Sequence, residues 1–110
     1  MALQKTFTLP SGYPADYIRF NRIEEWDRQR KVCTVRFDLW KDAAAAASPG
    51  VAPAIERAFR LRAVGADFDA WFGVSELSTE LFIAQVYAAA RVLPVDWWND
   101  RAPLSDAVDV

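Results

Sequence analysis

The fold of this chain is decided by a stretch that reads Val32-Cys33-Thr34-Val35-Arg36-Phe37-Asp38-Leu39. Its side chains alternate between an apolar row and a mixed row with a period of two. Successive side chains of a strand point to opposite faces of a sheet, whereas a helix would place Val35 away from Cys33 and Phe37. The stretch therefore predicts a β-strand that buries Cys33, Val35, Phe37 and Leu39.

The segment before this strand predicts a second, longer strand over residues 16–26. Ile18 and Phe20 would share one of its faces, while Ile23 breaks the alternation, which indicates a bulge or a twist near Arg22. The polar residues 27–30 between the two strands are typical of a tight turn. The two strands are therefore expected to form an antiparallel β-hairpin.

One further strand is predicted before this hairpin and one after it. Residues 5–9 alternate and end at the turn residues 10–12. Residues 57–64 alternate again, and we prefer a strand there, although residues 55–62 would also form an apolar helical face. The alanine run at 42–47 predicts one helical turn or a loop that crosses the edge of the sheet.

The C-terminal part of the chain has the periodicity of helices. Residues 67–73 predict a short helix, and residues 79–93 predict a longer one that begins after Ser78 and stops at Pro94. The stripe of this longer helix that would lie on the sheet consists of Phe82, Val86, Ala89 and Leu93. A second short helix is expected near residues 96–100.

Together these elements predict an α+β fold in a single domain that spans residues 1–110. Its strand-rich part covers residues 5–64, and its helical part covers residues 67–110. We expect a small antiparallel β-sheet of three to four strands, with an N-terminal hairpin and a C-terminal helix packed on one face.

The chain has no histidine and a single cysteine, Cys33. Histidine is the commonest general base and metal ligand, and one thiol can form neither an internal disulfide nor a multi-thiolate zinc site. The carboxylate pairs that remain lack the spacing of a calcium loop and are better explained as helix caps or solvent-facing residues. They are Asp67 with Asp69, Asp96 with Asp100, and Asp106 with Asp109. We therefore expect no enzyme activity, no metal and no cofactor.

Charge and hydropathy argue against nucleic acid and membrane as partners of this chain. The net charge is −2 and the pI is near 5.0, which argues against binding to nucleic acid through phosphate attraction. No apolar run approaches the length of a membrane span, and the first residues lack the apolar stretch of a signal peptide. We expect a chain that is made in the cytoplasm and has neither a membrane span nor a nucleic-acid partner.

The aromatic and arginine content points to binding of other proteins, because Trp, Tyr and Arg are enriched at the energetic centres of interfaces. A domain this small also needs large side chains to close its core, so some of its aromatics are expected there. A small sheet leaves open edges that invite another chain to pair. The candidate interface residues are Tyr13, Tyr17, Trp40, Arg60, Arg62, Trp97 and Trp98.

Several short motifs occur in an order that resembles a known family. They are MALQKTFTLPSG at 1–12, YIRF at 17–20, LWKDA at 39–43, FDAWF at 68–72, YAAARVLP at 87–94 and DAVDV at 106–110. This order is similar to that of small virion structural proteins, about 100 residues long, of tailed bacteriophages and prophages, encoded near tail or baseplate genes. Arg19 stands where the family commonly has histidine, and the alanine run and the Trp content also depart from its pattern.

The resemblance implies a virion component of the tail or baseplate, present as a homo-oligomer within a larger assembly. Its partners would be other virion proteins and copies of itself, and it would be made in the host cytoplasm. An alternative is a small ligand- or carbohydrate-binding module in which Tyr17, Trp97 or Trp98 stacks on a sugar. A carboxylate-based enzyme is the third hypothesis, and it would need two carboxylates that converge in a pocket.

Overall fold

The computed structural model describes residues 2–73, 77–97, 100–102 and 104–110, and of residues 100–102 only the backbone. The strands are β1 (Leu3–Thr8), β2 (Pro14–Asp27), β3 (Val32–Trp40), β4 (Ile55–Val64), β5 (Val95–Trp97), β6 (Asp100–Ala102) and β7 (Val108–Asp109). The helices are α1 (Ala43–Ala47), α2 (Ala66–Phe72) and α3 (Thr79–Ala90).

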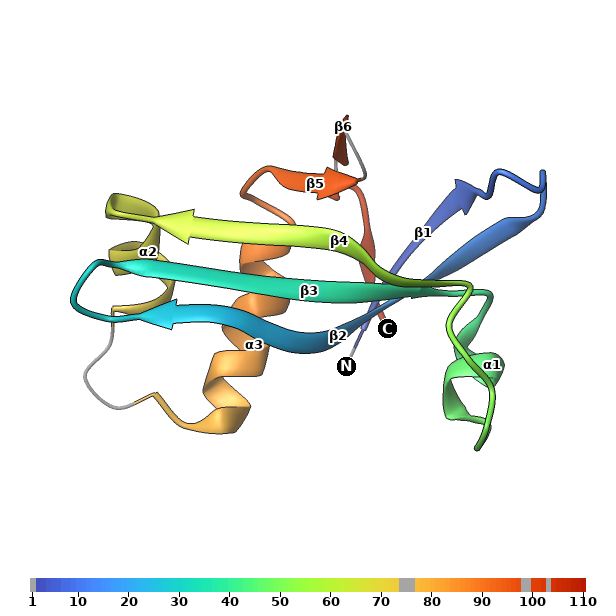
Figure 1. The fold of residues 1–110 in the computed structure, drawn as a ribbon, viewed down its shortest axis with the longest axis horizontal. Helices are drawn as coiled ribbons and strands as arrows, with labels where there is room; N and C mark the ends of the chain where they lie inside the picture. Colours follow the sequence, from blue (N-terminus) through green and yellow to red (C-terminus); the bar gives the residue numbers. More distant parts are fainter. Residues whose placement is uncertain (1, 74–76, 98–99, 103) are drawn as a thin grey trace.

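All of these strands belong to one antiparallel sheet with the order β6-β5-β4-β3-β2-β1-β7. The long strands β2, β3 and β4 form its centre, and β1 turns away from them at one end (Figure 1). The sheet curls strongly, as distances between ring centroids show. The ring centroid of Phe7 on β1 lies 5.1 Å from that of Phe59 on β4 and 5.2 Å from that of Trp97 on β5. Strands that are distant in the sheet order therefore face each other across a half-barrel.

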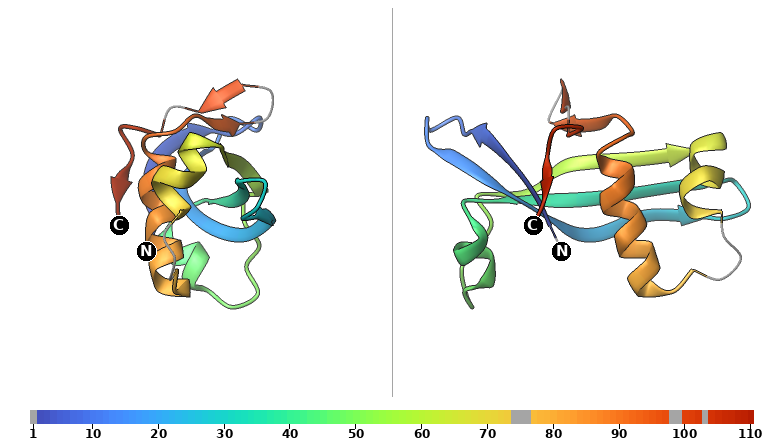
Figure 2. Two further views of the ribbon diagram at one scale, coloured as in Figure 1. Left: turned by 90° about the vertical axis from the view of Figure 1, so that its left-hand side faces the viewer. Right: turned by 180° about the vertical axis from the view of Figure 1, so that it is seen from behind.

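The first and last strands lie side by side at one edge of the sheet. Leu3 of β1 pairs with Asp109 of β7, and the backbones of Ala2 and Val110 exchange hydrogen bonds of 3.1 and 3.0 Å. The N and C labels accordingly lie next to each other in Figure 1 and in both views of Figure 2. The edge of β1 is thus covered by the end of the chain.

The structure confirms the predicted hairpin and its bulge. β2 and β3 pair in antiparallel register from Tyr17 with Trp40 to Asp27 with Val32. The register shifts between Phe20 and Arg22, where the broken alternation of the sequence indicated a bulge or a twist. Residues 57–64 lie in strand β4, so the preference for a strand over a helix at this position is also confirmed.

The predicted sheet of three to four strands with one C-terminal helix is wrong. Within the described residues the sheet has seven strands, and three short helices accompany it. The C-terminal segment returns to the sheet as β5, β6 and β7, so the short helix expected near residues 96–100 is also wrong. Each of these strands has only two or three residues, which is too short for the apolar period of a strand to show in the sequence.

The core lies between the sheet and helices α2 and α3. Figure 2 shows α3 crossing one face of the sheet, with α2 at one end of the long strands and α1 at the other. Helix α3 begins where Ser78 accepts a hydrogen bond of 3.1 Å from the N–H of Leu81, and it buries Phe82, Val86 and Ala89 of the predicted stripe. Leu93 lies beyond its end. None of the helices in the described ranges is long and apolar enough to cross a membrane.

Candidate protein interface

The two faces of the central sheet are different in kind. The inner face carries the apolar row of β3 and the facing residues of β4, which are buried under α2 and α3. The opposite face, here called the outer face, has no helix over it among the described residues (Figures 1 and 2). A sheet with one covered face and one solvated face is a common antiparallel arrangement, and the outer face is where a partner can approach.

Two bulges in β2 make its outer side unusually polar. The register pairs Phe20 with Phe37, then Arg22 with Arg36, Ile23 with Val35 and Glu25 with Thr34, so Asn21 and Glu24 are the extra residues. Each bulge inserts one residue into one strand. The side chains of Phe20, Ile23 and Trp26 therefore stay on the inner side at a spacing of three, with two polar residues between each pair.

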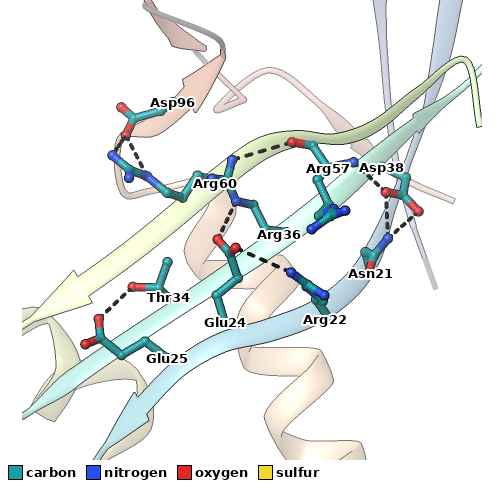
Figure 3. Close-up of polar contacts among 10 residues, drawn as sticks. All are labelled: Asn21, Arg22, Glu24, Glu25, Thr34, Arg36, Asp38, Arg57, Arg60 and Asp96. Carbon is teal, nitrogen blue, oxygen red and sulfur yellow. Dashed lines mark hydrogen bonds and ion pairs between the residues drawn. The ribbon is translucent and has the colours of Figure 1, made fainter.

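A row of arginines crosses the outer face. Arg22, Arg36 and Arg60 are register neighbours on β2, β3 and β4, and Asp96 of β5 follows Arg60. Arg60 contacts Asp96 at 2.8 Å, while Glu24 is bound by Arg36 and lies 3.8 Å from Arg22 (Figure 3). The hydrogen bond from Arg36 lowers the pKa of the Glu24 carboxyl below its ordinary value. These carboxylates hold the guanidinium groups side by side despite their like charge.

A second polar row lies beside the first. Thr34 donates a hydrogen bond of 3.4 Å to Glu25 (Figure 3). Arg62 of β4 approaches the same carboxylate at 3.9 Å. Both rows run perpendicular to the strands and link β2 with β4. The outer face is therefore a cross-linked array of charges rather than a set of independent solvated side chains.

Asp38 is the buried anchor at the end of this array. Its carboxylate accepts hydrogen bonds of 2.8 and 2.9 Å from the side chain of Asn21, and one of 2.7 Å from the backbone N–H of Arg57 (Figure 3). Arg57 has a φ of +54°, a conformation that side chains other than glycine rarely adopt. The bond to Asp38 holds this strained residue in place and leaves its own side chain exposed.

The structure brings together only some of the predicted interface residues. Arg60 and Arg62 lie on the outer face, as the alternation of β4 implied. Tyr13 is 72% exposed in the β1–β2 turn, remote from them. Trp97 is partly buried, with its ring stacked 4.9 Å from that of Phe59.

Of the remaining predicted interface residues, Tyr17 and Trp40 do not join the arginine row. Tyr17 is half-buried and lines a pocket of about 480 Å³ between β2, α1 and α3. Trp40 is half-buried, and its buried indole N–H has no hydrogen-bond partner among the described residues. Trp98 lies outside the described residues.

The outer face contains residues that the sequence did not single out as interface residues. They are Asn21, Arg22, Glu24, Glu25, Arg36, Asp38, Arg57 and Asp96. The available signal was the polar row of residues 32–38 together with the doublets at 21–22 and 24–25. The sequence alone does not show that these two groups of polar residues lie together, because this follows from the register that places the doublets beside β3.

Four aspartates of the three carboxylate pairs contact basic residues. Asp69 contacts Lys31 at 2.9 Å, and Asp106 contacts Lys5 at 2.7 Å. Asp109 contacts Arg91 at 3.2 Å, while Asp96 belongs to the arginine row described above. Within the described ranges, no three side chains of His, Cys, Asp or Glu form a group that could hold a metal ion.

Cys33 lies in the core, and burial raises the pKa of its thiol to about 12. An unfolded thiol ionises near pH 9.0, so the folded state binds one more proton above that pH and stability falls as pH rises. The thiol does not affect the pH dependence below pH 8. We expect this one group to lower the free energy of unfolding by about 1.4 kcal/mol between pH 8 and pH 10.

This expectation is measured by urea unfolding at the two pH values, with the Cys33→Ala variant as the matched control. The variant is expected to lose less stability than the parent by that amount. Equal losses in both proteins would show that the thiol ionises normally in the folded state.

Comparison with protein-family models, with curated proteins and with solved structures finds no match to this chain.

Proposed function

We propose that this chain is a non-catalytic structural protein that assembles with other proteins through the outer face of its sheet. The observation that carries the proposal is the arginine row, which lies on the sheet, has no helix over it in the described ranges and is cross-linked by carboxylates. Ion pairs within the row fix the guanidinium groups before a partner arrives, which lowers the entropic cost of binding.

The choice of cation supports an interface over a generic solvated surface. Arginine is enriched and lysine depleted at protein interfaces, because the planar guanidinium is weakly hydrated and forms bidentate contacts. The described outer face carries Arg22, Arg36, Arg57, Arg60 and Arg62. The lysines of the chain are at positions 5, 31 and 41, and none of them belongs to the arginine row.

In its more specific form, the proposal is a virion component of the tail or baseplate of a tailed bacteriophage. This part rests on the sequence resemblance given above, and a surface made for protein contacts is compatible with it. The carbohydrate-binding alternative has less support, because the ring of Trp97 is stacked on Phe59 and Tyr17 is half-buried. An exposed aromatic platform would be required for stacking on a sugar.

The test measures incorporation of the chain into particles purified from the strain that encodes it. The parent protein is expected in the particle fraction of a density gradient, and the variant R60E/R62E is expected there at roughly a tenth of that amount or less. The matched control is R28E/R30E, which makes the same change of charge in the β2–β3 turn and should incorporate normally.

The ion pairs of Arg60 and Arg62 are exposed, so both double variants should keep the melting temperature of the parent within a few degrees. Absence of the parent protein from particles would refute the virion assignment. Full incorporation of R60E/R62E would refute the outer face as the docking surface.

A further inference from the structure

The edge of β2 is open over its second half. β1 pairs with β2 only as far as Ile18, and no other described strand lies on that side of residues 19–27. The first backbone group on this edge is the N–H of Phe20, which donates a hydrogen bond of 2.6 Å to the hydroxyl of Tyr87 on α3. The N–H of Phe20 points away from β3 and is occupied by Tyr87, so a further strand on this side would pair through the backbone groups of Ile23 and Trp26.

The two bulges give this edge an unusual spacing of backbone groups. In a regular antiparallel strand, N–H and C=O groups face a given edge at every second residue. Here each bulge adds one residue between Phe20 and Ile23 and between Ile23 and Trp26, so the groups that face the open edge recur at every third residue. A regular strand would lose register within one repeat, whereas a strand with the same two bulges would stay in register.

The side chains around Ile23 are arranged symmetrically along the strand. Phe20 and Trp26 lie on the inner side at equal distance from Ile23, and a polar doublet lies on the outer side to each flank. The doublet before Ile23 is Asn21 with Arg22, and the doublet after it is Glu24 with Glu25. A two-fold axis at Ile23 therefore matches inner residues with inner residues and places arginine opposite glutamate.

The same edge exposes apolar surface. Ile23 is 46% exposed and Trp26 is 38% exposed. Both line a pocket of about 430 Å³ on the inner side of the edge, together with Leu77 and Phe82. Large apolar side chains beside an unpaired edge are the usual mark of a surface that another chain covers.

We propose that two copies of this chain pair through their β2 edges, antiparallel and about a two-fold axis at Ile23. Arg22 of each copy faces Glu24 of the other, Ile23 faces its own counterpart, and Trp26 of each copy covers the inner side beside Phe20 of the other. The proposal deepens the assembly role proposed above and rests on it for its biological purpose. The contact is isologous, so it closes after two copies and joins two sheets into one.

The first experiment is sedimentation equilibrium of the purified chain from micromolar to millimolar concentration. The parent is expected to dimerise in this range, and Ile23→Pro is expected to stay monomeric. Proline removes the N–H that faces the edge, a position where strands tolerate it, so circular dichroism of the variant should match that of the parent. A parent that remains monomeric throughout would overturn the proposal.

The second experiment exchanges the charges of Arg22 and Glu24, which face each other across the proposed contact. Unlike Ile23→Pro, these substitutions leave the backbone N–H groups in place. R22E places glutamates opposite glutamates, and E24R places arginines opposite arginines, so each variant alone should dimerise at least tenfold more weakly than the parent. An equimolar mixture should regain dimers, because the glutamates of one variant then face the arginines of the other. R30E is the matched control and should dimerise like the parent.

The outcomes separate this proposal from the assembly role. Failure of the mixture to form heterodimers, or a dimer that Ile23→Pro leaves intact, would place any self-association elsewhere. If the dimer behaves as expected but R60E/R62E still enters particles, the β2 edge stands and the outer face fails as a docking surface. If the parent is monomeric yet R60E/R62E is lost from particles, the outer face stands as a docking surface and pairing through the β2 edge fails.

Discussion

Replacement of Phe37 by alanine is expected to lower the free energy of unfolding by about 4 kcal/mol. Phe37 is fully buried in the middle of β3, and its ring lies 5.7 Å from Tyr87 on α3 and 6.3 Å from Phe20 on β2. The substitution removes the apolar surface of the ring and leaves a cavity where the sheet meets the helix. The residues around Phe37 come from β2, β4 and α3, so the site can collapse only in part.

The measurement is the midpoint and slope of urea unfolding for Phe37→Ala and for a matched aromatic on the surface. Tyr13 is 72% exposed, so Tyr13→Ala should change stability by less than about 0.5 kcal/mol. If Phe37→Ala cost less than about 1 kcal/mol, the described packing of α3 on the sheet would be wrong.

Replacement of Asp38 by alanine is expected to cost about 3 kcal/mol, although it removes only a small polar side chain. Asp38 is 7% exposed and satisfies donors from two other strands, the amide of Asn21 on β2 and the N–H of Arg57 on β4. Without the carboxylate, both donors are left in a site that water reaches poorly. The strained backbone of Arg57 also loses the bond that holds it.

Three further variants separate the contributions of the Asp38 carboxylate, the Asn21 amide and the Arg57 backbone. Asp38→Asn keeps one acceptor oxygen and should cost about 1 kcal/mol, while Asn21→Ala removes a single donor and should cost about as much. Arg57→Gly keeps the N–H and relieves the positive φ, so its cost should be close to zero. A cost for Asp38→Ala no greater than that for Asn21→Ala would show that Asp38 does not anchor β4.

The long elements could be predicted from the sequence because their apolar period extends over enough residues. β3 alternates throughout, and α3 carries a stripe and a serine cap, so both were found at nearly their observed bounds. β5, β6 and β7 could not be found, since strands of two or three residues are selected by their neighbours rather than by their own pattern. The width of the sheet was underestimated for that reason.

The candidate site was predicted only in part for a related reason. Arg60 and Arg62 stood out because β4 alternates regularly, whereas Arg22 and Glu24 occupy a strand whose alternation is broken twice. A bulge shifts every later side chain to the other face, so the position of these residues depends on where the extra residue lies. The position of the extra residue depends on the pairing of β2 with β3 and on the contact with Asp38. The local sequence pattern does not indicate either of these.

The pairing of β1 with β7 makes the order of synthesis matter. β1 leaves the ribosome before the other strands of the sheet, and among the described strands its outer edge is covered by β7, which is made after all of the others. Until then the nascent polypeptide presents an unpaired edge at a time when neighbouring nascent chains are close by. Closing so long a loop is entropically slow, which makes the last step of folding the time of greatest risk of misassembly.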